Sequence, residues 1–144
     1  MLSKVEEYRL LIADVYELAG LSRRTSEDLA REVGQTAARW HVLSVLSDGP
    51  RTVPAAARRL GLAPQSVQRV ASDLVTSGHL EAVDNPDHAR SPLMRLTPFG
   101  RATLGELFSR SGEDRAAVLA RAEVTAGELA AAREVLRRLT GALR

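Results

Sequence analysis

The sequence contains no cysteine, which excludes disulfide bonds and regulation by thiol oxidation. Aromatic residues make up only 3% of the chain, so its few rings stand out as candidates for a core or a ligand pocket. No apolar run is long enough to predict a membrane span. The first ten residues, MLSKVEEYRL, lack the apolar centre of a secretion signal. These absences lead us to expect a cytoplasmic protein that does not contact a membrane.

Motifs of catalytic sites are also missing. The chain has no glycine-rich phosphate loop, no GxSxG motif and no HExxH motif. His79 and His88 fall in one short segment with Asp84 and Asp87, but they lack the tight spacing of metal ligands. The sequence therefore predicts a protein that is not an enzyme, with no cofactor and no metal site.

Charge is distributed unevenly along a chain whose 144 residues match one domain. Residues 51–101 carry seven arginines against four acidic residues, a net charge of +3. Residues 1–50 carry a net charge of −2 and residues 102–144 one of +1, which agrees with the total of +2. Positive charge thus gathers on the middle segment, as attraction to nucleic-acid phosphates requires.

The middle segment has the pattern of two short helices joined by a tight turn. Pro54 is tolerated in the first turn of a helix, and Gly61 favours the end of that helix. Leu62 is expected to pack between the two helices, and Pro64 to begin the second. The apolar residues of the second helix recur at helical spacing and predict its buried face. They are Val67, Val70, Ala71, Leu74 and Val75.

A β-hairpin is predicted directly after this pair of helices. Residues 79–83 and 93–96 are strand candidates, and the turn-forming run 84–92 lies between them. Arg90 is near the tip of this loop, where it would reach a phosphate or a minor groove. Thr97 is expected to cap a further helix that begins at Pro98. Helix, turn, helix and hairpin in this order predict a winged helix-turn-helix.

Polar side chains occupy the start of the second helix, which a helix-turn-helix inserts into the major groove. Glutamine, serine and arginine supply the hydrogen-bonding groups that base edges and phosphates require. An ordinary solvated helix face is the alternative interpretation. The predicted DNA-binding residues are Thr52, Pro64, Gln65, Ser66, Gln68, Arg69, His88 and Arg90.

Both ends of the chain are predicted to be amphipathic helices. Ser3 with Glu6, and Thr125 with Glu128, form capping-box patterns, and each precedes an apolar stripe at helical spacing. The C-terminal stripe consists of Leu129, Ala132, Leu136, Leu139 and Leu143. Such stripes bury themselves either within one subunit or against a second copy of the chain.

Three segments resemble the MarR family of bacterial transcriptional regulators: LGLAPQSVQRVASDLVTSGHLE, NPDHARSPLMRLTPFG and ARWHVLSVL. The resemblance implies a mainly α (α+β winged helix) fold and one domain over residues 1–144. Residues 35–100 would form the DNA-binding lobe, and residues 1–34 and 101–144 the dimerisation helices. Two positions depart from the family pattern. His88 stands where the wing often has aspartate, and Ala63 where serine or threonine usually caps the second helix.

The resemblance further implies a homodimer that binds a palindromic operator in double-stranded DNA, as a repressor that a small ligand releases. An aromatic acid would suit a pocket that offers rings and cations. The candidates to line it are Tyr8, Tyr16, Arg39, Trp40 and His41, although a large ring such as Trp40 is more often part of the core. Two alternatives remain open, namely a winged-helix protein-interaction module and a DNA-bending protein without a sensor.

Overall fold

The computed structural model describes every residue from Met1 to Arg144. Six helices and three strands follow one another along the chain. In order they are α1 (Lys4–Arg31), α2 (Ala37–Val45), β1 (Arg51–Thr52), α3 (Val53–Leu60), α4 (Pro64–Thr76), β2 (Leu80–Val83), β3 (Leu93–Leu96), α5 (Pro98–Ala122) and α6 (Ala126–Ala142). The chain divides into two compact units, residues 1–108 and residues 109–144, and the boundary lies within α5.

Side-chain caps fix where the helices begin. Ser3 and Glu6 form the predicted capping box of α1, and Thr125 and Glu128 form that of α6. In each box the cap hydroxyl accepts from the backbone of the glutamate, and the glutamate carboxylate accepts from the backbone of the cap residue. These bonds satisfy N–H groups that a helix start leaves without partners, so both capping-box predictions are confirmed.

The predicted pair of helices in the middle segment is present as α3 and α4. Gly61 ends α3 in the left-handed conformation, with φ of 69°, and α4 begins at Pro64 as expected. The expectation for Leu62 is wrong, because its side chain is 45% exposed. The turn is closed instead by the backbone, where the Leu62 N–H donates to the Ala57 carbonyl over 3.0 Å.

The buried face of α4 is narrower than the sequence suggested. Val67, Ala71 and Leu74 are buried and Val70 packs against the same core. Val75 is 39% exposed, since each residue turns a further 100° or so around the helix axis and leaves the core side after Leu74. The opposite face of α4 is consequently held toward solvent.

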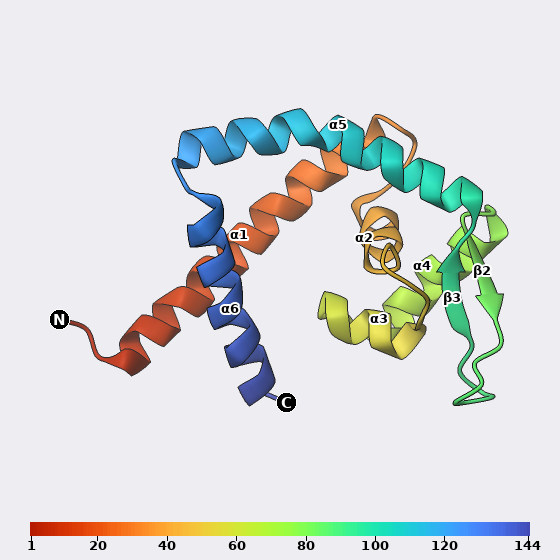
Figure 1. Cartoon of the computed structure of the whole chain (residues 1–144), viewed down its shortest axis with the longest axis horizontal. Helices are drawn as coiled ribbons and strands as arrows, with labels where there is room; N and C mark the ends of the chain where they lie inside the picture. Colours follow the sequence, from red (N-terminus) through yellow and green to blue (C-terminus); the bar gives the residue numbers. More distant parts are fainter. The chain divides into compact units, whose positions relative to one another are not determined.

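The three strands form one antiparallel sheet in the order β1-β3-β2. β2 pairs with β3 from Leu80↔Leu96 to Val83↔Leu93, so the hairpin is confirmed, with its first strand beginning one residue after His79. β1 was not predicted, and it pairs Arg51 with Met94. Figure 1 shows the loop between β2 and β3 extending beyond the sheet as a wing, the name used below for residues 80–96.

The core of the first unit lies where α2, α3 and α4 meet the hairpin. Trp40 and Leu43 from α2, Leu74 from α4 and Leu80 from β2 are almost completely buried there. Leu104 and Leu107 from α5 belong to the same cluster. This core fixes the position of α4 relative to the wing.

The terminal helices expose much of their apolar surface. Only Ser26, Leu29 and Ala30 of α1 are buried, and no residue of α6 is buried. Val5, Tyr16 and Leu18 of α1 and Leu129 and Leu136 of α6 are all exposed. None of the helices combines the length and the apolar character needed to cross a membrane.

Candidate nucleic-acid interface

The start of α4 presents the predicted polar side chains to solvent. Gln65, Ser66, Gln68 and Arg69 are all exposed, because the buried residues of α4 lie on the opposite face of the helix. Ala63 is the N-cap, and no side-chain hydrogen bond caps α4. The Arg69 guanidinium makes no ion pair within the protein, so its charge is available to an external partner.

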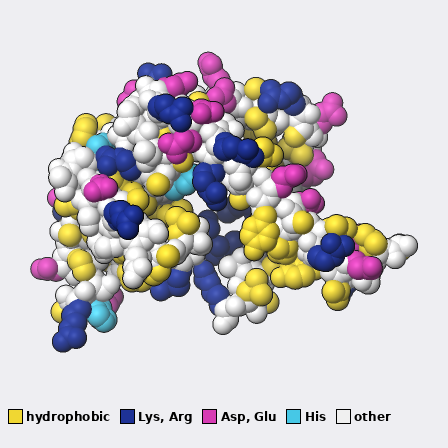
Figure 2. Space-filling model, turned by 180° about the vertical axis from the view of Figure 1, so that it is seen from behind, with side chains coloured by type: hydrophobic (Ala, Val, Ile, Leu, Met, Phe, Trp, Pro, Cys, Tyr) yellow, Lys and Arg dark blue, Asp and Glu magenta, His cyan; other side chains and the backbone are white.

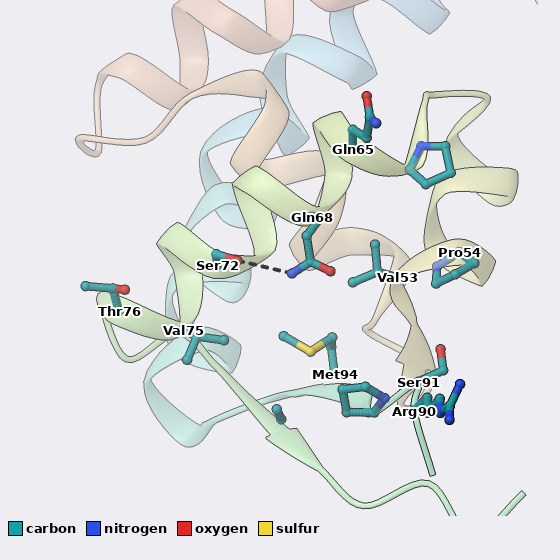
Figure 3. Close-up of a pocket in the computed structure, with 13 residues that line it drawn as sticks. Val53, Pro54, Gln65, Gln68, Ser72, Val75, Thr76, Arg90, Ser91 and Met94 are labelled. Carbon is teal, nitrogen blue, oxygen red and sulfur yellow. Dashed lines mark hydrogen bonds between the residues drawn. The ribbon is translucent and has the colours of Figure 1, made fainter. Parts of the chain in front are cut away.

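A hollow of about 670 Å³ lies between α4, the start of α3 and the wing. It brings Pro64, Gln65, Gln68 and Arg90 together, four of the residues predicted from sequence to bind DNA. Figure 3 shows Gln68 extending from α4 into this space, where its Nε2 donates to the Ser72 hydroxyl over 3.1 Å. Ser66 and Arg69 do not line the hollow, and Ser72 and Met94 were not predicted to do so.

The wing carries its predicted residues at its far end. His88 and Arg90 are exposed in the loop between β2 and β3. In Figure 2 the wing is the projection at the lower left, and basic, histidine and acidic side chains lie close together there. On the strands, Arg95 pairs with Glu81 at 2.6 Å, which neutralises the charge of that arginine. Arg90 therefore supplies the unpaired arginine of the wing, which also carries the exposed acids Asp84 and Asp87.

Thr52 has a structural role at the start of α3. Its hydroxyl oxygen accepts from the Ala55 N–H over 3.2 Å and caps the helix. The side chain is partly buried, at the position where the sheet meets α3. A phosphate contact through the remaining O–H stays a prediction.

The residues predicted to line a ligand pocket occupy different environments. Trp40 is part of the core and only 2% exposed, Arg39 and His41 are partly buried on α2, and Tyr8 and Tyr16 are exposed on α1. Neither the hollow against α4 nor a second one beside Arg51 and Arg59 is lined by any of the five. The ligand pocket stays a prediction.

Arg39 belongs to a hydrogen-bonded group that the sequence did not reveal. Its Nε donates to Gln35 over 2.7 Å and its Nη2 to the Ser77 hydroxyl over 3.0 Å. The Nδ1 atom of the buried His79 lies 2.7 Å from that hydroxyl. Burial, and then the charge of Arg39, lower the pKa of His79. The group ties α2 to the segment between α4 and β2.

His79 is also packed against Phe99, with 4.4 Å between the ring centroids. Its Nε2 atom is buried without a hydrogen-bond partner. No group of three or more His, Cys, Asp or Glu side chains is arranged to hold a metal ion. His79 is thus enclosed by the junction of α4, β2 and α5.

Comparisons with known proteins agree with this geometry. The model of the MarR family matches residues 33–91. The uncharacterized protein Rv2011c of Mycobacterium tuberculosis is 54% identical over 106 residues, covering 74% of this chain and 74% of that protein. The transcriptional regulator BldR from Sulfolobus solfataricus matches with a TM-score of 0.82 at 18% identity, over 95% of this chain and 99% of that chain.

A cysteine-to-serine mutant of MarR from E. coli, complexed with operator DNA, matches with a TM-score of 0.71 at 22% identity. The match covers 96% of this chain and 99% of that chain. These structures share the mainly helical architecture with a small three-stranded sheet, so the winged-helix fold predicted from sequence is confirmed.

Proposed function

The chain belongs to the MarR family, and from this premise we propose that it is a cytoplasmic transcription regulator that binds double-stranded DNA as a homodimer. One observation carries the proposal: the exposed polar start of α4 and the arginine-bearing wing border the same hollow. A concave surface with hydrogen-bonding side chains on one border and a free cation on the other suits a duplex. The related MarR structure that holds operator DNA supports the same function.

Each α4 would enter a major groove with its N-terminal residues against the base edges. Gln65, Gln68 and Arg69 offer the amide and guanidinium groups that pair with adenine and guanine. Arg90 would reach the flanking minor groove or its phosphates. In a symmetric dimer the two copies of α4 would lie about one helical turn of DNA apart, which corresponds to a palindromic operator.

The exposed apolar residues of the terminal helices support the homodimer. A protomer that exposes so many apolar side chains on α1 and α6 requires a partner surface to cover them. A second copy of the same chain offers the same chemistry with two-fold symmetry. We therefore assign dimerisation to residues 1–34 and 101–144, and DNA binding to residues 35–100.

Repression released by a small aromatic acid is the regulatory part of the proposal. A ligand bound between the dimerisation helices and the DNA-binding lobe would change the separation of the two α4 helices. A coupling of about 1–3 kcal/mol is enough for such a switch. Following the fluorescence of Trp40 while phenolic acids are added tests this part, and a flat response contradicts it.

Selection of bound duplexes from a random pool tests DNA recognition directly. We expect a symmetric consensus whose half-sites are about one helical turn apart. Binding to it should weaken steeply with salt, with a slope that reports the number of phosphates neutralised. Binding without sequence preference would favour a DNA-bending protein. No binding at low salt would favour a protein-interaction module.

A further inference from the structure

The loop of the wing is closed by a single side chain, that of Asn85. Its Oδ1 accepts from the Asp87 N–H over 3.0 Å, and its Nδ2 donates to the Ser91 carbonyl over 3.0 Å. Two backbone bonds complete the loop, from the His88 N–H to the Asn85 carbonyl and from the Ser91 N–H to the His88 carbonyl, each over 3.2 Å. The Asn85 amide therefore spans the loop from its first residues to the residue after Arg90.

The two bonds need one short side chain that carries both an acceptor and a donor, which the asparagine amide provides. The Asp87 N–H is a donor and the Ser91 carbonyl is an acceptor, so the amide must present its oxygen to one and its nitrogen to the other. Aspartate lacks the donor, and serine is too short to reach across the loop. Asn85 is partly buried, whereas its loop neighbours Asp87, His88 and Arg90 are exposed.

The loop carries Arg90 one residue before the anchored Ser91. The Arg90 guanidinium makes no hydrogen bond or ion pair that would orient it. The direction in which its side chain leaves the wing thus depends on the backbone of the loop. A backbone held in one conformation before binding avoids the entropy loss of ordering it on the DNA.

We propose that Asn85 is a positioning residue, which pre-orders the loop of the wing so that the backbone carrying Arg90 needs no further ordering when Arg90 meets the DNA backbone. The inference rests on the proposed DNA-binding function and names the residue on which the wing contact depends. Asn85 itself has no role in base recognition. Its side chain is engaged within the loop, so its contribution to binding passes through Arg90.

Asn85→Ala removes both side-chain bonds, and Asn85→Ser keeps a short acceptor for the Asp87 N–H while losing the link to Ser91. Each variant should bind the selected duplex roughly fivefold more weakly per wing, a loss similar to the cost of ordering about one flexible side chain. Ala89→Ser is the matched control, because it changes an exposed side chain of the same loop and leaves both Asn85 bonds in place. It should bind like the parent protein.

A double-mutant cycle with Arg90→Ala tests whether the binding loss caused by Asn85→Ala depends on Arg90. Asn85→Ala should have almost no effect when Arg90 is already replaced, and the melting temperature should stay close to that of the parent. An equal loss in both backgrounds, or parental affinity for Asn85→Ser, overturns the inference. So does an Arg90→Ala variant that binds like the parent. Failure of the parent to bind any duplex would instead overturn the proposed function.

Discussion

The backbone of Gly100 lies against the carbonyl oxygen of His79. A Cβ atom at position 100 would collide with that oxygen, and Gly100 is buried in the first turns of α5. The Thr97 N–H donates to the same carbonyl over 3.1 Å. The start of α5 therefore packs directly against the backbone at His79, where the chain enters the wing. This close contact requires glycine at position 100.

Gly100→Ala should destabilise the protein by about 1–3 kcal/mol or more, because neither backbone segment can move without breaking hydrogen bonds. Gly105→Ala, in the same helix with open space around its α-carbon, should stabilise it by about 0.5–1 kcal/mol. Urea unfolding of both variants measures the difference. Equal stability of the two would show that the close approach is not maintained in solution.

Stability should decrease as the pH falls through the range below about 6.5, the ordinary pKa of histidine. Burial and the charge of Arg39 lower the pKa of His79 in the folded state. The unfolded chain therefore takes up a proton at a higher pH than the folded chain does, which favours unfolding in acid. The stabilising contribution of His79 is complete above a pH of about 6.5. It is lost progressively as the pH falls from there to the lowered pKa of His79 in the folded state.

Denaturant unfolding of the parent and of His79→Gln at several pH values tests this expectation. The variant should depend less on pH between neutral and mildly acidic conditions. His88→Gln, in the exposed loop of the wing, controls for the loss of a histidine as such. If the free energy of unfolding depends on pH in the same way for the parent and for His79→Gln, His79 is not the source of the pH dependence.

Ala63→Ser should stabilise the protein by about 1 kcal/mol, because a serine hydroxyl would cap α4. Ala63 has the extended backbone of an N-cap, with φ of −67° and ψ of 137°. The same exchange at the exposed Ala38, within the first turn of α2, adds no cap and should not stabilise. Thermal unfolding distinguishes the two, and no gain at position 63 would mean that Pro64 already sets the start of the helix.

Arg69→Ala and Arg90→Ala should impair DNA binding in different ways. The first should relax base preference at one position and cost about 1–3 kcal/mol on the consensus duplex. The second should weaken binding to all duplexes similarly and lower the salt slope by about one per protomer. Arg95→Ala is the control, since Glu81 already pairs with that arginine. Variants of Arg69 and Arg90 that keep parental affinity and preference would contradict the docking of α4 and the wing.

Leu129→Glu should weaken the dimer at least a hundredfold, equivalent to about 2.8 kcal/mol, because the interface would have to bury a charge. Leu129 lies on the apolar stripe of α6 and is exposed in the single chain. Ala130→Glu adds the same charge outside the stripe and should leave the dimer intact. Sedimentation at several concentrations measures both, and a Leu129→Glu dimer of parental stability would remove α6 from the interface.

Local patterns in the sequence were sufficient to predict most helices and the wing. Capping boxes, Gly61 and Pro64 act through bonds and dihedral angles of near neighbours, so the boundaries they predicted are present in the structure. β1 was missed because a strand of two residues is too short to show an alternation of apolar and polar side chains. Its partner strand β3 is also far away in the sequence. Leu62 was misplaced because a local pattern does not show which way a turn residue faces, and Leu62 is 45% exposed.

The sequence predicted which types of residue form the candidate site, but not the hydrogen bonds that hold them in place. Polar residues at the start of α4 and an arginine on the wing follow from composition and order alone. The bonds of Asn85 across the loop depend on backbone geometry that no periodicity expresses. The group of Arg39, Ser77 and His79 joins residues up to 40 positions apart, which a pattern search within short windows does not connect.

The pairing of β1 with β3 has a mechanical consequence. Thr52 ends β1 and caps α3, so the wing and the first helix of the motif are joined through one ladder of hydrogen bonds. Tilting the wing toward a narrower groove would drag the α3 N-terminus with it. A change in the angle of the wing would therefore be transmitted to the start of α3 rather than absorbed within the hairpin.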